Sequence, residues 1–187
     1  MARVPYLDPE DLDPDDRDVL SRPINLARVL AHSPAGSRAF SRLGGWIRFT
    51  SKLDPRLREM AILRVGVLAR SDYEYSHHIK IGREFGLTDA DIRSVIDGPD
   101  SPALGEIERL VLTATDEATV AGAISEATFE ALAVHLDDEL LVELTLVISF
   151  YNAVVRFLAS LAIDVEPEYL TYLDEFPLEA ESEERES

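Results

Sequence analysis

The chain has 187 residues, of which 46% are hydrophobic, and it carries a formal net charge of −18 and no cysteine. This length and apolar content are typical of one globular domain, or at most two small ones, rather than of a disordered chain. The acidity argues against nucleic acid and anionic membrane as partners, and the lack of cysteine excludes disulfides, thiol catalysis and cysteine-ligated zinc.

Acidic residues gather near both ends of the chain, at residues 7–18 and 179–187. We expect an acidic N-terminal arm at residues 1–19, a helical domain at 20–165 and an acidic tail at 166–187. The tail contains an apolar stretch at 169–178 that is suited to docking on a neighbouring subunit. The start of the chain shows no basic-plus-apolar signal, so we expect a cytoplasmic protein.

The first helical region is "RPINLARVLAHSPAGSRAFSRLGGWIRF" at residues 22–49. It predicts two helices with a break near Ser33-Pro34, the second weakened or ended at Gly44-Gly45. The next stretch, residues 53–70, opens with Asp54 as a predicted N-cap and Pro55 at the first helical position. Its apolar residues are too many for one narrow stripe, so we expect this helix to be buried on most sides.

Two shorter helices follow. One begins near Asp72 and stops at Gly86, where a left-handed C-terminal cap is expected. The other begins after Thr88, with Asp91 three residues on, and is closed by Gly98.

Later helices start near Ser101 and Ser125, and the last occupies residues 137–163. About seven or eight helices with short connections predict an all-α, single-domain helical bundle. The last helix is the most apolar segment, yet polar residues interrupt it, so we expect a buried helix and no membrane partner. These residues are Glu143, Asn152 and Arg156.

The segment "SDYEYSHHIKIG" at residues 71–82 contains the main candidate site. Glu74 and His78 are four residues apart, so their side chains share one face of a helix, whereas His77 points about 100° away. A carboxylate beside an imidazole can orient it, raise its pKa and exchange protons with it. Glu59, in the preceding apolar helix, needs a polar partner and is the third candidate.

Other polar residues can support this site. Tyr73 and Tyr75 flank Glu74, and Asn152 and Arg156 interrupt the apolar last helix, so we assign these four and His77 to substrate binding. Polar groups in apolar helices line either a cavity or an interface, and the sequence leaves both open. We expect His32 and His135 to be peripheral.

Three segments together resemble a known family. They are residues 22–49, the stretch "RLREMAILRVGVLARSDYEYSHHIKIGREFGLTDADI" and the later "LVELTLVISFYNAVVRFLASLAI". They look like the carboxymuconolactone decarboxylase and alkylhydroperoxidase D-like (AhpD-like) family over roughly residues 20–165. The resemblance implies an AhpD-like fold and a homo-oligomer (dimer, trimer or hexamer) with active sites near the subunit boundary.

The peroxidase branch of that family uses a glutamate, two cysteines three residues apart, and a histidine four beyond the second cysteine. Laid on this chain, the pattern falls on Glu59, Ser71, Glu74 and His78. The acid–base positions are kept and both thiol positions are lost. Neither Ser71 nor Glu74 can cycle through a disulfide, so thiol peroxidase activity is excluded. Ser71 is interpreted as a turn or N-cap residue.

The decarboxylase branch resembles this chain at the motif itself, because a glutamate there also replaces the second cysteine. The resemblance implies a cofactor-independent acid–base enzyme, a decarboxylase, lyase or isomerase, acting on a small carbonyl, lactone or carboxylate compound. In this hypothesis His78, held by Glu74 or Glu59, supplies a proton, and Arg156 or a tyrosine holds a carboxylate or oxyanion.

Two alternatives stay open. One is a non-catalytic, oligomeric helical protein that binds a small molecule. The other is metal-assisted chemistry at Glu59, Glu74 and His78, since carboxylate–histidine sets bind metals in helical bundles. The chain has no repeated Glu-x-x-His motif, so neither a metal nor another cofactor is expected.

Overall fold

The computed structural model describes residues 2–178, and every regular element in that range is a helix. The all-α prediction is confirmed, and seven of the nine α-helices have eight residues or more. The α-helices are α1 (Asn25–Leu30), α2 (Pro34–Phe49), α3 (Pro55–Leu68), α4 (Asp72–Glu84), α5 (Asp89–Asp97), α6 (Glu106–Val120), α7 (Glu126–Ala133), α8 (Asp138–Leu161) and α9 (Leu170–Glu175). Three 3-10 helices are η1 (Pro9–Asp11), η2 (Pro14–Leu20) and η3 (Pro167–Tyr169).

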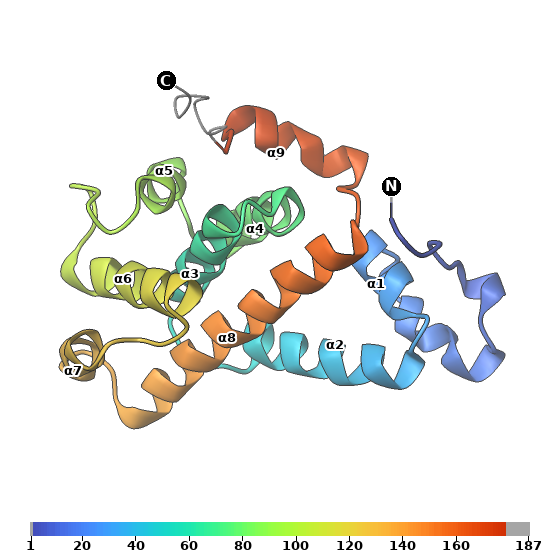
Figure 1. Ribbon diagram of the computed structural model, residues 1–187, viewed down its shortest axis with the longest axis horizontal. Coiled ribbons are helices and arrows are strands. Elements are labelled where there is room, and N and C mark those ends of the chain that lie inside the picture. Colours follow the sequence, from blue (N-terminus) through green and yellow to red (C-terminus); the bar gives the residue numbers. More distant parts are fainter. Residues whose placement is uncertain (1, 179–187) are drawn as a thin grey trace, which may run out of the picture.

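Helix α3 forms the centre of the bundle and contacts α4, α5, α6 and α8 (Figure 1). It begins as predicted, because the Asp54 carboxylate accepts hydrogen bonds from the first backbone amides and Pro55 occupies the first turn. Every residue from Leu57 to Gly66 is buried. The prediction of a helix buried on most sides is therefore confirmed, and polar residues of α3 must find partners inside the protein.

The predicted helix ends are confirmed at two glycines and wrong at a third place. Gly86 and Gly98 have φ angles of 97° and 88°, in the region that glycine tolerates best. By contrast, α2 runs through Gly44-Gly45 to Phe49 without a break. Neither glycine of that pair has a positive φ, and Phe150 of α8 packs beside Gly44, so tertiary contacts hold the helix together.

Helix α8 crosses the molecule diagonally in Figure 1. By length and composition it is apolar enough to cross a membrane, and a core helix passes the same test. One side of α8 packs into the core against α3, α4 and α6, as expected for a buried helix. The Glu143 carboxylate is occupied there too, since it accepts hydrogen bonds from the backbone amides of Lys52 and Leu53.

The end of the described chain packs on its own protein. Helix α9 contacts α4 (Figure 1). Arg83 pairs with Glu175, and the Phe176 ring is buried. The apolar stretch predicted to dock on a neighbouring subunit is thus covered largely within one chain. The acidic end of that predicted tail, 179–187, lies outside the described residues.

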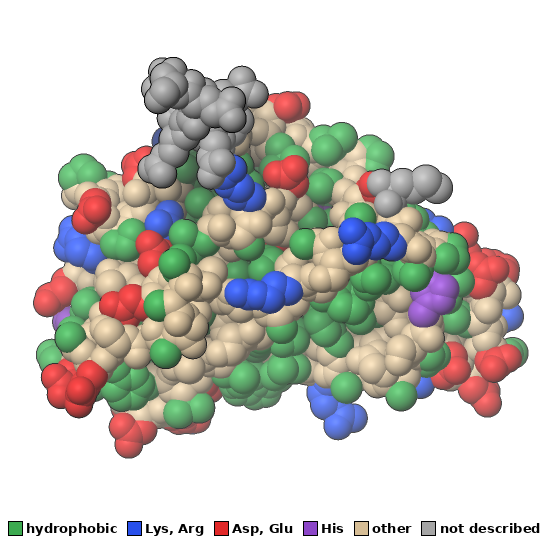
Figure 2. All heavy atoms as spheres, in the orientation of Figure 1, with side chains coloured by type: hydrophobic (Ala, Val, Ile, Leu, Met, Phe, Trp, Pro, Cys, Tyr) green, Lys and Arg blue, Asp and Glu red, His purple; other side chains and the backbone are tan. Residues whose placement is uncertain are grey.

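The surface shows a contrast in charge between the ends and the middle. In Figure 2 acidic side chains gather at both ends of the face shown, whereas the area crossed by α8 shows hydrophobic and uncharged groups with a few basic side chains. Exposed apolar side chains include Val120 and Val142 on α6 and α8. The area crossed by α8 therefore carries little of the net negative charge of the sequence.

Candidate active site

Helices α3 and α4 bring the three predicted catalytic residues together. His78 Nδ1 lies 2.7 Å from Glu59 Oε2, and His78 Nε2 lies 2.9 Å from Glu74 Oε1. The second contact follows from the i,i+4 spacing on α4, and the first requires α3 to pack against α4. One imidazole is therefore held between two carboxylates.

This cluster is buried and contains a fourth charged residue. Arg58 Nε donates a hydrogen bond of 3.0 Å to Glu59 Oε1, and its guanidinium stacks over the Phe85 ring. Arg58, Glu59, Glu74 and His78 are each 1–4% exposed. With His78 protonated, two cations balance two anions, which is the favourable arrangement for charges removed from water.

The pKa values reflect that balance. Burial alone would lower the pKa of His78, but the charge of Glu59 and the hydrogen bonds of Glu59 and Glu74 outweigh it and raise the pKa to about 9. Burial likewise opposes ionisation of Glu59, yet His78 and then Arg58 hold its pKa below the ordinary value. At neutral pH the cluster thus stores a proton on the imidazole.

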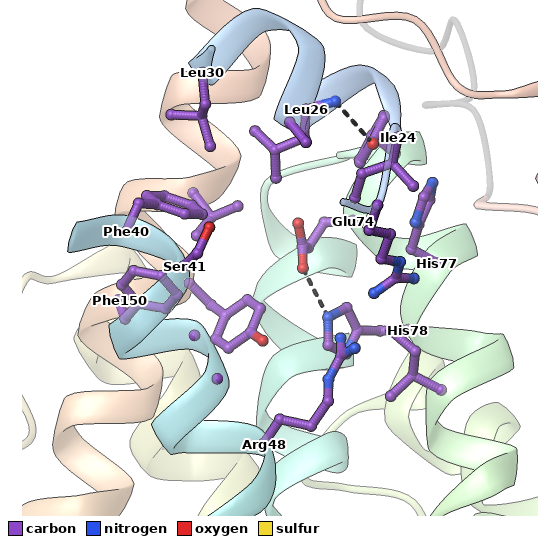
Figure 3. Close-up of a pocket in the computed structure, with 18 of the residues that line it drawn as sticks. Ile24, Leu26, Leu30, Phe40, Ser41, Arg48, Glu74, His77, His78 and Phe150 are labelled. Atoms are coloured by element: carbon purple, nitrogen blue, oxygen red, sulfur yellow. Dashed lines mark hydrogen bonds and ion pairs between the residues drawn. The ribbon is translucent and has the colours of Figure 1, made fainter. Parts of the chain in front are cut away.

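A cavity of about 310 Å³ opens beside this cluster. Glu74 and His78 lie at its wall, and Figure 3 shows the Glu74 carboxylate between His78 and the start of α1. One Glu74 oxygen contacts His78, and the other has no hydrogen-bond partner among residues 2–178. Most of the remaining wall is apolar, with contributions from Ile24, Leu26, Leu30, Phe40, Phe49, Phe150, Tyr151 and Val154.

Two arginines, Arg22 and Arg48, line the cavity and were missed by the sequence reasoning. Arg48 extends from α2 toward the side of the cavity where His78 lies (Figure 3). Among residues 2–178 neither guanidinium forms an ion pair with an acidic side chain, although the protein carries 36 acidic residues. A signal was present, because residues 34–49 contain three arginines and no acidic residue.

His77 belongs to a second cluster. Its Nε2 lies 2.8 Å from Glu166 Oε2, and its ring stacks between Tyr73 and Tyr169 at centroid distances of 4.2 and 3.6 Å. The Tyr73 hydroxyl also donates to Glu166, at 3.0 Å. Both His77 and Tyr73 line the cavity, but their polar atoms are directed to Glu166, which the sequence reasoning did not single out.

Three residues that we assigned to substrate binding do not line this cavity. Tyr75 is fully buried, and its hydroxyl has no partner among the described residues. Asn152 and Arg156 line a separate cavity between α6 and α8, where the Arg156 guanidinium donates to Asn152 Oδ1. This corrects our assignment of Asn152 and Arg156 to the substrate site. On α8, Tyr151 faces the cavity, and its neighbour Asn152 faces away from it.

The remaining polar candidates have structural partners. The Ser71 hydroxyl accepts from the Glu74 amide at the start of α4, as predicted for an N-cap. His32 and His135 are exposed, as expected. Within residues 2–178 no group of three or more acidic or histidine side chains is arranged to hold a metal ion, and both His78 nitrogens already face carboxylates.

The fold and this buried glutamate–histidine cluster define an AhpD-like helical protein. Residues 34–117 match the model of the Carboxymuconolactone decarboxylase family. The matched range includes α3, α4 and the whole Glu59–His78–Glu74 cluster. The predicted resemblance is confirmed over that range, and the chain carries no cysteine.

Individual relatives agree with this placement. The chain is 29% identical to the uncharacterized protein YnjA of Escherichia coli K12 over 125 residues, 65% of this chain and 68% of YnjA. It superposes on the AhpD core of a peroxidase-related protein from Ralstonia eutropha JMP134 with a TM-score of 0.79 and 21% identity, covering 92% and 95% of the two chains. It also superposes on the debrominase Bmp8, solved as a cysteine-to-alanine variant in complex with 2,3,4-tribromopyrrole. That superposition has a TM-score of 0.78 and a sequence identity of 19%, and it covers 96% of this chain and 100% of the Bmp8 chain.

Proposed function

We propose that this protein is a cofactor-independent acid–base enzyme, a decarboxylase, lyase or isomerase, whose substrate is a small anionic compound with an apolar body. The coarser conclusion, an enzyme acting on a small molecule, is supported by the family and by the debrominase neighbours. The observation that carries the finer proposal is the imidazole held between two carboxylates at the wall of a mostly apolar cavity.

Glu74 is the group that meets the substrate in this proposal. His78 has both nitrogens engaged, while one oxygen of Glu74 is left for the cavity. A proton therefore passes from His78 Nε2 to Glu74 and from there to the substrate, and Glu59 steadies the imidazole throughout. Such positioned proton transfer contributes roughly 10²–10⁴-fold to a rate.

In a decarboxylation the bond between the carboxylate and its neighbouring carbon breaks, and CO₂ leaves. The electron pair of that bond remains as a dienolate conjugated to a carbonyl. Glu74 then delivers the proton from His78 to that carbon, and water restores the proton to the relay. Isomerisation uses the same residues, with Glu74 first removing a proton and then returning it at another carbon.

Arg48 replaces Arg156 as the proposed anion-binding residue. It reaches the cavity from α2 and lacks an acidic partner within the described chain, so its charge is available to a carboxylate or a developing oxyanion. Arginine binds such groups through two parallel N–H bonds. Aromatic and aliphatic side chains cover the rest of the cavity and suit an apolar body.

Neighbours with thiol chemistry do not transfer their reaction to this chain. The Bmp8 complex was formed with a variant in which a cysteine is replaced by alanine, and the present chain has no cysteine at all. We propose that this chain and Bmp8 share only a small, apolar cavity in the same fold. The thiol step has no counterpart here.

The test is a substrate screen with carboxylated lactones, enols and β-keto acids, followed by NMR for product and by CO₂ release. Native protein is compared with Glu74→Gln, His78→Gln and Arg48→Met, with His135→Gln as the matched surface control. We expect the first two variants to lower kcat and Arg48→Met mainly to raise KM. Equal turnover by native protein, Glu74→Gln and His78→Gln on an accepted substrate would refute the assigned roles.

The non-catalytic alternative predicts a different outcome. Ligands of the same class would bind to the cavity with a measurable Kd, yet no compound would be turned over and no variant would change a rate. Calorimetry on the same panel distinguishes the two. A homo-oligomer in the cytoplasm stays a prediction, and the acid-poor face crossed by α8 is the surface we propose for contact between copies (Figure 2).

A further inference from the structure

Helix α1 forms part of the cavity wall but lacks the usual means of starting a helix. It contributes Leu26, Ala27 and Leu30 to the cavity, and Ile24 precedes it at the N-cap position. An isoleucine has no side-chain oxygen to receive the free backbone amides. With only six residues, α1 is also too short to be stable by itself.

The missing acceptors come from distant parts of the chain. The Asn25 amide donates to Glu166 Oε1 at 2.6 Å, and the Leu26 amide donates to the Tyr73 hydroxyl at 3.1 Å. Figure 3 shows the second of these bonds beside the cavity. The Tyr73 hydroxyl in turn donates to the same Glu166 oxygen. The Glu166 carboxylate, which lies 141 positions beyond Asn25 in the sequence, thus caps the first turn of α1.

Glu166 is itself firmly held. It is 8% exposed, and its second oxygen contacts His77, whose ring lies between those of Tyr73 and Tyr169. A residue just before Glu166 adds to the anchorage, because the Asp164 carbonyl accepts from the Asn25 side chain at 2.9 Å. Hydrogen bonds to a charged acceptor are roughly twice as strong as neutral ones. The contacts of Glu166 with His77 and Asn25 therefore hold the start of α1 against α4.

We propose that Glu166 is a positioning residue that fixes α1 over the cavity, so that the segment after α8 sets the shape of the substrate site. The effect on turnover rests on the proposed function, but the coupling of Glu166 to α1 does not. Loss of the cap releases Leu26 and Leu30 from the cavity wall and leaves Glu74 and His78 in place, since these two are held by α3 and α4. Substrate fit then suffers while the proton relay persists.

Hydrogen exchange measured without any substrate tests the coupling first. In Glu166→Ala we expect the amides of Asn25 and Leu26 to exchange at least about tenfold faster. The Asn25 amide loses its acceptor, and the Tyr73 hydroxyl that accepts from Leu26 loses its own partner. Glu166→Gln retains an oxygen for Asn25 and Tyr73 and should show a smaller increase. Glu168→Ala, an exposed neighbour in η3, is the matched control and should leave α1 unchanged.

Unchanged exchange of α1 in Glu166→Ala overturns the proposal. If that variant instead loosens α3 as well, Tyr73→Phe decides, because it removes only the hydroxyl that joins Leu26 to Glu166. Faster exchange confined to α1 in Tyr73→Phe supports the coupling. Protection of α1 equal to that of native protein in this variant refutes it.

Anilinonaphthalene sulfonate, a fluorescent apolar anion, tests the effect on the cavity. We expect its Kd to change at least about threefold in Glu166→Ala and to be unaltered in Glu168→Ala. With a substrate from the screen, Glu166→Ala should raise KM while kcat stays within about twofold. A fall in kcat at constant KM would contradict a positioning role. Absence of any turnover would count against the proposed function only, since exchange and dye binding need no reaction.

Discussion

His77 and His78 are adjacent in the sequence, yet they belong to two different clusters. His78 lies between Glu59 and Glu74, which come from α3 and α4 in the middle of the bundle. His77 meets one carboxylate, Glu166, which reaches it from beyond α8. The first cluster can hold and move a proton at the cavity, and the second connects the end of the described chain to the wall of that cavity.

The difference shows how neighbouring residues of one type acquire separate roles. On a helix adjacent side chains point about 100° apart, so each meets its own surroundings. Two buried carboxylates favour the imidazolium form of His78, whereas stacking between Tyr73 and Tyr169 fixes the position of the His77 ring. Four experiments test this contrast, and the one with the greatest expected effect comes first.

The two histidines should differ most in catalysis. We expect His78→Gln to lower kcat by roughly 10²–10⁴-fold, because it removes the proton store. His77→Gln keeps an N–H for Glu166 and should change chiefly KM, with kcat within about tenfold. Steady-state kinetics on the substrate found by the screen measures both. Similar losses of kcat in the two variants would erase the contrast.

The two glutamates should differ in their contribution to stability. Glu59→Gln leaves Arg58 and His78 without their shared anion in the core, and we expect a loss of about 3–5 kcal/mol in the free energy of unfolding. Glu166→Gln keeps part of its hydrogen bonding and should cost about 1–2 kcal/mol. Urea denaturation followed by circular dichroism measures both, with Glu168→Gln as the exposed control. A larger loss of unfolding free energy in Glu166→Gln than in Glu59→Gln would contradict this expectation.

The pH dependence of stability should report on His78. Its pKa is raised from 6.5 to about 9 in the folded protein, so its contribution is fully present below pH 6.5 and is lost as pH rises through 9. The shift corresponds to at most about 3 kcal/mol. Urea midpoints measured across this window should fall for native protein and fall less for His78→Gln. Parallel curves would show that His78 does not carry this proton.

The smallest effect is expected at the stacking partner of His77. Tyr169→Leu keeps an apolar side chain and removes the ring contact, so we expect a loss of about 1 kcal/mol in the free energy of unfolding. Thermal unfolding measures it, with the same replacement at the half-buried Tyr172 of α9 as the control. Equal shifts in the two variants would indicate that the stack on His77 contributes nothing of its own.

Local sequence signals predicted much of this architecture. Asp54 and Pro55 marked the start of α3, Thr88 and Asp91 formed the expected capping box at α5, and Gly86 closed α4. These features depend on contacts within a few residues, which sequence spacing specifies directly. The weakening or end expected at Gly44-Gly45 is not observed, because packing on α8 overrides the weak helix propensity of glycine.

The candidate site was predictable in part for the same reason. Glu74 and His78 share a helix face by spacing alone, and Glu59 was singled out because an ionisable group in an apolar helix needs a polar partner. Spacing alone does not place Arg48 at the cavity or Glu166 beside α1 and His77, because both placements depend on how separate elements pack. Asn152 and Arg156 were misplaced because periodicity shows which side chains share a face, but not which face turns toward the cavity.

Composition and helical spacing can be read without knowing how helices pack. They were enough to establish an all-α fold, the absence of thiol chemistry and the pairing of Glu74 with His78. Three further features required the arrangement of the helices in space: Glu59 completes this pair, Arg48 faces the cavity and Glu166 caps α1. Each of these depends on how separate helices pack. Burial in that packing is also what raises the strength of every charge contact in the site.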